Sequence, residues 1–163
     1  MKIIKMVMIM MAMIMGVVMG NIVDQTCKQT PDYNLCVSLL SSDPRSSSAD
    51  TAGLALILVD KIKALGTETL GEINNAYKTK PMLKKPLDEC KGKYTTIVSD
   101  VKVAITALTQ RDIKIGEESV VDVGLEAFTC ETRFLKGQSP LSSLTQRMRK
   151  ICDVTSAIIR MLL

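Results

Sequence analysis

The sequence has no histidine and no tryptophan, and aromatic residues make up only 3% of its 163 residues. Without histidine there is no imidazole acid or base, no Ser-His-Asp or Cys-His pair and no histidine ligand for zinc. The cysteines lack any CxxC spacing, and no glycine pattern resembles a phosphate-binding loop. These absences predict that the chain is not an enzyme and that it binds no metal or cofactor.

One group of carboxylates is close enough in sequence to suggest acid and base catalysis. Glu117, Glu118 and Asp122 follow one another closely. A solvated helix N-terminus explains them better, because the helix dipole stabilises acidic side chains in the first turn. The cluster is therefore interpreted as the exposed start of a helix.

The chain opens with the pattern of a secretory signal peptide. Lys2 and Lys5 form a basic segment, and an apolar run extends from Met6 to Met19. This run is shorter than the roughly 20 residues needed to cross a bilayer, so a cleaved leader is favoured over a membrane anchor. We expect a signal peptide over residues 1–20, cleaved before Asn21.

The remaining residues, 21–163, suffice for one domain with its own core and leave no room for a second. Removing Lys2 and Lys5 leaves 19 of the 21 basic residues against 17 acidic ones. With this small positive excess, three tyrosines and two phenylalanines, nucleic acid is not an expected partner. No later segment is long and apolar enough to cross a membrane, so no membrane contact is expected after cleavage.

Five cysteines follow the leader, and the oxidising secretory route favours disulfides among them. Cys27 and Cys36 flank a segment in which Thr30-Pro31-Asp32 predicts a turn, so the two could meet in a hairpin. Cys90 and Cys130 each lie in an amphipathic pattern and could join two helices. An odd number leaves at least one thiol over, and spacing alone leaves every pairing open.

Hydrophobic periodicity predicts four long helices. The first opens near Asp50 and ends by Pro81, and the second starts near Pro86. The third runs from about Glu117 to Leu135, before a stop at residues 137–140. The apolar positions of the third are Val120, Val121, Leu125, Phe128 and Phe134, and those of the fourth are Leu141, Leu144, Met148, Ile151, Thr155, Ile158 and Leu162.

The three- and four-residue steps in the last segment are typical of a helix that packs along the seam of a bundle. Four such segments with short connections predict an all-α fold, an up-and-down four-helix bundle. Cys152 lies beside the seam of the last helix and is interpreted as a small buried hydrophobic residue.

Four stretches are distinctive when taken together. They are TCKQTPDYNLC at residues 26–36, LALILVD at 54–60, SPLSSL at 139–144 and AIIRMLL at 157–163. The chain after its leader resembles the plant invertase/pectin methylesterase inhibitor family and, within it, the cell-wall or vacuolar inhibitors of β-fructosidase, also called invertase inhibitors. The resemblance implies a four-helix bundle preceded by a small helical hairpin, in agreement with the periodicity.

The resemblance also implies a disulfide pattern. The four cysteines of the family match Cys27, Cys36, Cys90 and Cys130. The implied bonds are Cys27–Cys36 and Cys90–Cys130, which leaves Cys152 as an additional cysteine.

The function implied by the resemblance is docking on a secreted acid invertase (β-fructofuranosidase) and blocking its active-site cleft. In invertase inhibitors a Pro-Lys-Phe motif between the second and third bundle helices contacts that cleft. The aligned residues here, and hence the expected target-binding residues, are Asp112, Ile113, Lys114 and Ile115. Lys114 is kept, whereas Ile113 replaces the proline and Ile115 replaces the phenylalanine.

Alternatives remain for these residues and for the function. Ile113 and Ile115 could equally be packing residues between helices. The target could be a pectin methylesterase, or the chain could be an interaction protein of the same fold that inhibits neither enzyme. A signal peptide is compatible with the cell wall (apoplast) and with the vacuole, and no sorting motif separates the two.

Overall fold

A small helical hairpin begins the part of the chain that the structure, a computed structural model, describes, which is residues 22–163. Its first arm is the helix over residues 22–27, and its second is α2, Tyr33–Ser41. Asp32 begins α2, because its carboxylate accepts a hydrogen bond from the backbone N–H of Leu35 at 3.0 Å. A Cys27–Cys36 disulfide joins the two arms. The expected signal peptide and its cleavage site lie outside the described residues.

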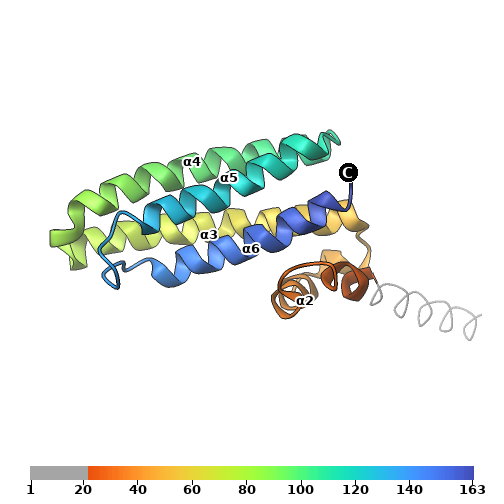
Figure 1. The fold of residues 1–163 in the computed structure, drawn as a ribbon, viewed down its shortest axis with the longest axis horizontal. Coiled ribbons are helices and arrows are strands. Elements are labelled where there is room, and N and C mark those ends of the chain that lie inside the picture. The colour runs from red at the N-terminus through yellow and green to blue at the C-terminus, as the bar shows by residue number, and fades with distance from the viewer. Residues whose placement is uncertain (1–21) are drawn as a thin grey trace, which may run out of the picture.

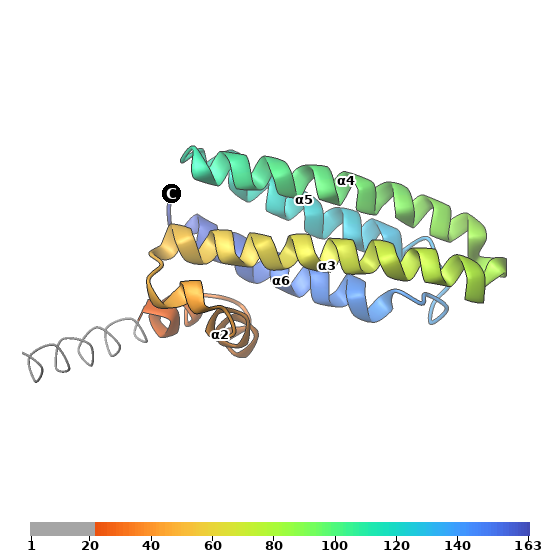
Figure 2. The same ribbon diagram turned by 180° about the vertical axis from the view of Figure 1, so that it is seen from behind.

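Four long helices follow the hairpin, with their axes aligned along the long axis of the molecule (Figure 1). Each packs against the next along the chain, and the last returns to the first, which closes the bundle. The short connections make neighbouring helices antiparallel (Figure 2). The bundle helices are α3 (Thr51–Thr79), α4 (Lys84–Thr109), α5 (Ile113–Glu131) and α6 (Ser142–Arg160), and two short 3-10 helices, η1 (Pro44–Ser47) and η2 (Pro81–Leu83), precede α3 and α4.

The core lies along the axis of the bundle and fits the periodicity of the sequence. The seam predicted for the last helix is buried at Met148, Ile151, Thr155 and Ile158. The predicted fold class, an all-α bundle behind a helical hairpin with two disulfides, is confirmed.

The third bundle helix differs from its prediction in position. It begins at Ile113 and ends at Glu131, whereas the sequence pattern placed it from about Glu117 to Leu135. The carboxylate of Asp112 caps the helix four residues earlier than expected. Phe134 is buried as predicted, although it lies beyond the helix.

The third helix also differs in the face that it buries. Val121, Leu125 and Phe128, predicted as part of its apolar face, are 43%, 58% and 43% exposed. The buried face consists mostly of small side chains, because these let the backbones of neighbouring helices approach closely. Its residues are Gly116, Ser119, Val120, Val123, Ala127 and Cys130.

The second disulfide, Cys90–Cys130, joins α4 to α5 across the core, with 4.6 Å between the Cα atoms. Cys152 remains a free thiol and is buried on α6, as its sequence position predicts. Burial raises the pKa of this thiol well above its usual value, so that the thiolate is disfavoured. The fold therefore uses four cysteines as cross-links and the fifth as packing.

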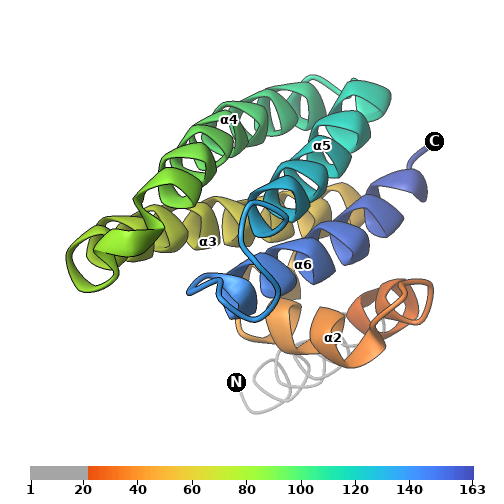
Figure 3. The ribbon, with the colours of Figure 1, turned by 60° about the vertical axis from the view of Figure 1, so that its left-hand side comes forward.

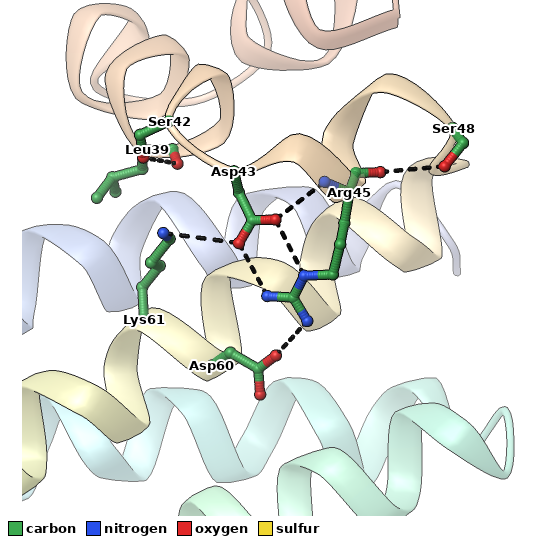
Figure 4. A network of polar contacts seen from close by, with 7 residues as sticks. All are labelled: Leu39, Ser42, Asp43, Arg45, Ser48, Asp60 and Lys61. Atoms are coloured by element: carbon green, nitrogen blue, oxygen red, sulfur yellow. Dashed lines mark hydrogen bonds and ion pairs between the residues drawn. The ribbon is translucent and has the colours of Figure 1, made fainter.

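A polar network joins η1, which follows the helical hairpin, to helix α3 of the bundle (Figure 4). The guanidinium of Arg45 donates to the carboxylate of Asp43 at 3.0 and 2.9 Å and to that of Asp60, on α3, at 2.7 Å. Lys61 Nζ lies 3.6 Å from Asp43. The hydrogen bonds from Arg45 hold the pKa of Asp43 well below its usual range. The network fixes η1 against the start of the bundle.

Candidate functional site

The expected target-binding residues lie where α4 turns into α5. The helices are joined by Gln110, Arg111 and Asp112, at the same end of the bundle as the C-terminus (Figures 1 and 2). We call residues 110–115 the α4–α5 tip. The alignment placed the motif residues in a loop between two helices. In the structure Ile113, Lys114 and Ile115 instead form the first turn of α5.

Asp112 has a structural role at the tip. Its carboxylate Oδ1 accepts a hydrogen bond from the backbone N–H of Ile115 at 3.3 Å. Its own N–H donates to the carbonyl of Ala107 at 2.8 Å, which ties the connection back to α4. Asp112 therefore fixes the start of α5 and the direction in which the next three side chains leave the backbone.

The two isoleucines of the tip point to different surroundings. Ile113 is half-buried and packs against the core, as the packing interpretation expects. Ile115 is 45% exposed and is thus available to a partner. The packing alternative therefore fits Ile113, whereas a role of Ile115 in target binding stays a prediction.

Lys114 lies between them with its side chain 77% exposed. Its Nζ is 4.0 Å from Oε1 of Glu118, which is also exposed. An exposed pair at this distance contributes little to stability, because solvent screens it. The ammonium group of Lys114 can therefore exchange this weak contact for a carboxylate on another molecule.

A notch beside the tip provides apolar surface next to the ammonium group of Lys114. Its volume is about 340 Å³, and its walls include Lys102, Val103 and Ala107 on α4 and Gln110, Asp112 and Ile115 at the tip. Val103 is 45% exposed and faces this notch together with Ile115. Sequence reasoning missed Val103; the signal was a valine on α4 outside the apolar positions of that helix.

Gly116 sets how closely the two helices converge at the tip. A Cβ atom at this position would lie 2.6 Å from Cδ2 of Leu108 on α4. A larger residue would therefore require the Leu108 side chain or the start of α5 to shift. The glycine thus helps to shape the notch between Val103 and Ile115.

Arg111 adopts a backbone conformation that is unusual for its residue type. Its φ angle is +62°, in the left-handed region, where a side chain with a Cβ costs about 1–2 kcal/mol. Glycine is the usual residue at such a position after a helix. The sequence pattern gave no sign of this conformation, because an arginine does not predict a left-handed turn.

The acidic cluster of α5 has a different explanation from the one expected. Glu117 lies beyond the first turn of the helix, so the prediction that the helix dipole accounts for it is wrong. Its Oε1 instead accepts a hydrogen bond from Nε of Arg160 on α6 at 2.8 Å and forms an ion pair with Nη2 of the same residue at 2.7 Å. This ion pair joins α5 to the end of α6 near the C-terminus.

A second surface feature is a groove of about 560 Å³ between α5 and α6, which lie side by side in Figure 3. The exposed side chains of Val121, Leu125 and Phe128 line it. The guanidinium of Arg149 covers the Phe128 ring at 4.8 Å from its centroid. None of the expected target-binding residues lines this groove.

Two further features concern residues 22–163. No helix in this part combines the length and apolar character that crossing a bilayer requires. Nor does this part bring together three or more side chains of the types that hold a metal ion.

The sequence and fold were compared with those of known proteins. Residues 21–158 match the family described as plant invertase/pectin methylesterase inhibitor. The chain is 59% identical over 140 residues to cell wall / vacuolar inhibitor of fructosidase 1 of Arabidopsis thaliana, covering 85% of this chain and 68% of the relative. It is also 33% identical over 147 residues to cell wall / vacuolar inhibitor of fructosidase 2 of Arabidopsis thaliana, covering 85% of this chain and 82% of that relative.

Pectin methylesterase inhibitors are more distant. A pectinesterase inhibitor of Actinidia deliciosa is 27% identical over 152 residues, covering 88% of this chain and 80% of that protein. The crystal structure of a mutant form of a pectin methylesterase inhibitor from Arabidopsis has the same fold, with a TM-score of 0.72 at 21% identity, covering 84% of this chain and 94% of the other. The family match over most of the chain and the identity to its members lead to one conclusion: this chain belongs to the plant invertase/pectin methylesterase inhibitor family.

Proposed function

We propose that this protein inhibits an acid invertase (β-fructofuranosidase) by placing its α4–α5 tip in the active-site cleft. The 59% identity to a relative named as an inhibitor of fructosidase is the observation that carries the proposal. The same name supports a location in the cell wall or the vacuole. The proposal makes the protein a binding partner of a glycosidase and not an enzyme.

The geometry of the tip supports the proposed contact. Lys114 presents a cation whose present partner is only a distant exposed carboxylate. Glycosidases cleave sugars with paired carboxylates, so a sugar-binding cleft offers acceptors for this ammonium group. Ile115 and Val103 add apolar area on either side of the notch. A contact that pairs the cation and buries this area would fill the cleft and exclude the substrate.

The rigidity of the tip also supports tight binding. Asp112, the residue before the motif, caps the N-terminus of α5, and Gly116 lets α5 pack closely on α4. A side chain held on a capped helix loses less conformational freedom on binding than one on a flexible loop. Replacement of the family's proline by Ile113 therefore leaves the tip ordered by other means.

Pectin methylesterase is the second candidate target. The observation in its favour is the match to a pectinesterase inhibitor, at 27% identity. The higher identity to inhibitors of fructosidase ranks invertase first.

The experiment is a titration of purified residues 21–163 against an acid invertase and a pectin methylesterase at acidic pH. We expect one-to-one inhibition of the invertase, with an inhibition constant at least about tenfold lower than for the esterase. Inhibition of the esterase alone would assign the protein to the second target. Inhibition of neither enzyme would leave an interaction protein of this fold and contradict the proposal.

A further inference from the structure

Arg111 occupies a position where the backbone favours glycine. Among residues 22–163 it is the one non-glycine residue with a positive φ angle. Its backbone N–H donates to the carbonyl of Leu108 at 3.2 Å, which completes the turn after α4. Glycine would make the same turn without the steric conflict of a Cβ atom. The arginine side chain is therefore not what the turn requires.

The charged group of Arg111 also takes no part in the polar contacts of the described fold. The residue is exposed, and within residues 22–163 no hydrogen bond or ion pair engages its guanidinium group. Of the nearby acids along the chain, Asp112 caps α5 and Glu118 lies beside Lys114. A strained residue whose charged group has no polar partner within residues 22–163 is a candidate for a role outside the fold.

The neighbours of Arg111 belong to the proposed contact. Gln110 and Asp112, on either side of it, line the notch, and Lys114 follows three residues later. A partner that covers the notch and pairs with Lys114 would therefore come close to the turn at Arg111. A planar guanidinium can donate two parallel hydrogen bonds to one carboxylate, which an ammonium group cannot do with the same geometry.

We propose that Arg111 is a second cationic contact of the tip, which pairs with an Asp or Glu side chain at the rim of the invertase cleft. This inference rests on the proposed function and goes further, because it assigns a role to a residue outside the Pro-Lys-Phe motif. Binding of a partner by the side chain would account for an arginine where the turn favours glycine.

The test separates stability from inhibition. Arg111→Gly removes both the strain and the guanidinium, so its melting temperature should rise by a few degrees while its inhibition constant for acid invertase rises about tenfold or more. Arg111→Asn controls for the flexibility of glycine, since asparagine tolerates the left-handed region and keeps a Cβ. It should lose as much inhibition as the glycine variant. Arg111→Lys keeps the charge without the fork and should fall between these variants and the wild type.

The salt dependence of inhibition gives a readout that a purely structural role would not change. Inhibition by the wild type should weaken more with added salt than inhibition by Arg111→Asn, because one ion pair is missing in the variant. If Arg111→Gly and Arg111→Asn inhibit as well as the wild type, the inference is overturned and the proposed function stands. If the wild type inhibits neither invertase nor pectin methylesterase, the proposed function fails, and the contact assigned to Arg111 fails with it.

Discussion

The carboxylate of Asp112 accepts a hydrogen bond from the backbone N–H of Ile115 at 3.3 Å. This contact starts α5 immediately after Asp112, so that Ile113 turns toward the core and Ile115 toward solvent. The lysine between them is held on the first turn of a helix instead of a loop. The position of the candidate site thus depends on one cap as well as on the motif residues.

Truncating Lys114 to alanine should weaken inhibition of acid invertase about thirtyfold, equivalent to about 2 kcal/mol of binding free energy. The reason is the loss of the exposed cation that pairs with carboxylates in the cleft. The inhibition constants of wild type and variant give the measurement. Lys136→Ala removes another exposed lysine, outside the tip, and should leave the constant within about twofold. Equal effects of the two substitutions would contradict the assignment.

Restoring the family motif with Ile113→Pro and Ile115→Phe should tighten inhibition. Ile113 is the first residue of α5, where proline is well tolerated because its missing N–H has no partner within the helix. Ile115 is 45% exposed, so a larger ring at this position has room. The double variant should melt within a few degrees of the wild type and have a lower inhibition constant. An unchanged constant would mean that residue 115 does not enter the cleft.

The sequence predicted α3 and α6 well because their apolar positions repeat along one face and large side chains fill the core. Met148 and Ile151 on α6 show this agreement. On α5 the same reasoning identified the buried Val120 but was wrong for Val121, Leu125 and Phe128. Its large residues Leu125 and Phe128 are exposed, because close contact with the neighbouring helices selects small residues for the inner face. Periodicity shows which side chains share a face of the helix. It does not show whether the neighbouring helix lies far enough away for large side chains to fit on that face.

The motif at the tip could be located from the sequence, but its conformation could not. Alignment placed Lys114 between two helices without showing that Asp112 would draw it into α5. The positive φ angle of Arg111 could not be predicted from its residue type, because glycine or asparagine usually marks such a position. Exposed Val103 belongs to the site only because α4 and α5 meet there.

The two disulfides should contribute unequally to stability. Replacing Cys90 and Cys130 together by serine should lower the free energy of unfolding by about 4 kcal/mol, and replacing Cys27 and Cys36 by about 3 kcal/mol, because the first bond closes a longer loop. Cys152→Ala should cost about 1 kcal/mol. Urea denaturation of the three variants gives the order. The largest loss in Cys152→Ala would contradict it.

The Asp43 network should make stability depend on pH in a defined window. The carboxylate has a pKa of about 3.9 in an unfolded chain, and hydrogen bonds from Arg45 lower this pKa in the folded protein. The stabilisation is therefore complete above pH about 4 and is lost as the pH falls below it, since the unfolded chain then binds the proton more readily. Asp43→Asn should be less stable than the wild type at pH 6, with a smaller difference at pH 3. A difference that stays constant between these pH values would mean that the carboxylate charge does not act in the network.

A photo-crosslinking residue placed at position 115 tests the central claim, that the α4–α5 tip enters the invertase cleft. The same residue at position 125, which replaces the exposed Leu125 in the α5–α6 groove, is the matched control. We expect position 115 to form crosslinks to peptides that line the sucrose-binding cleft, and unmodified inhibitor in excess to prevent them. Position 125 should form few or none. Crosslinks from position 125 with none from position 115 would show that the groove, and not the tip, binds the enzyme.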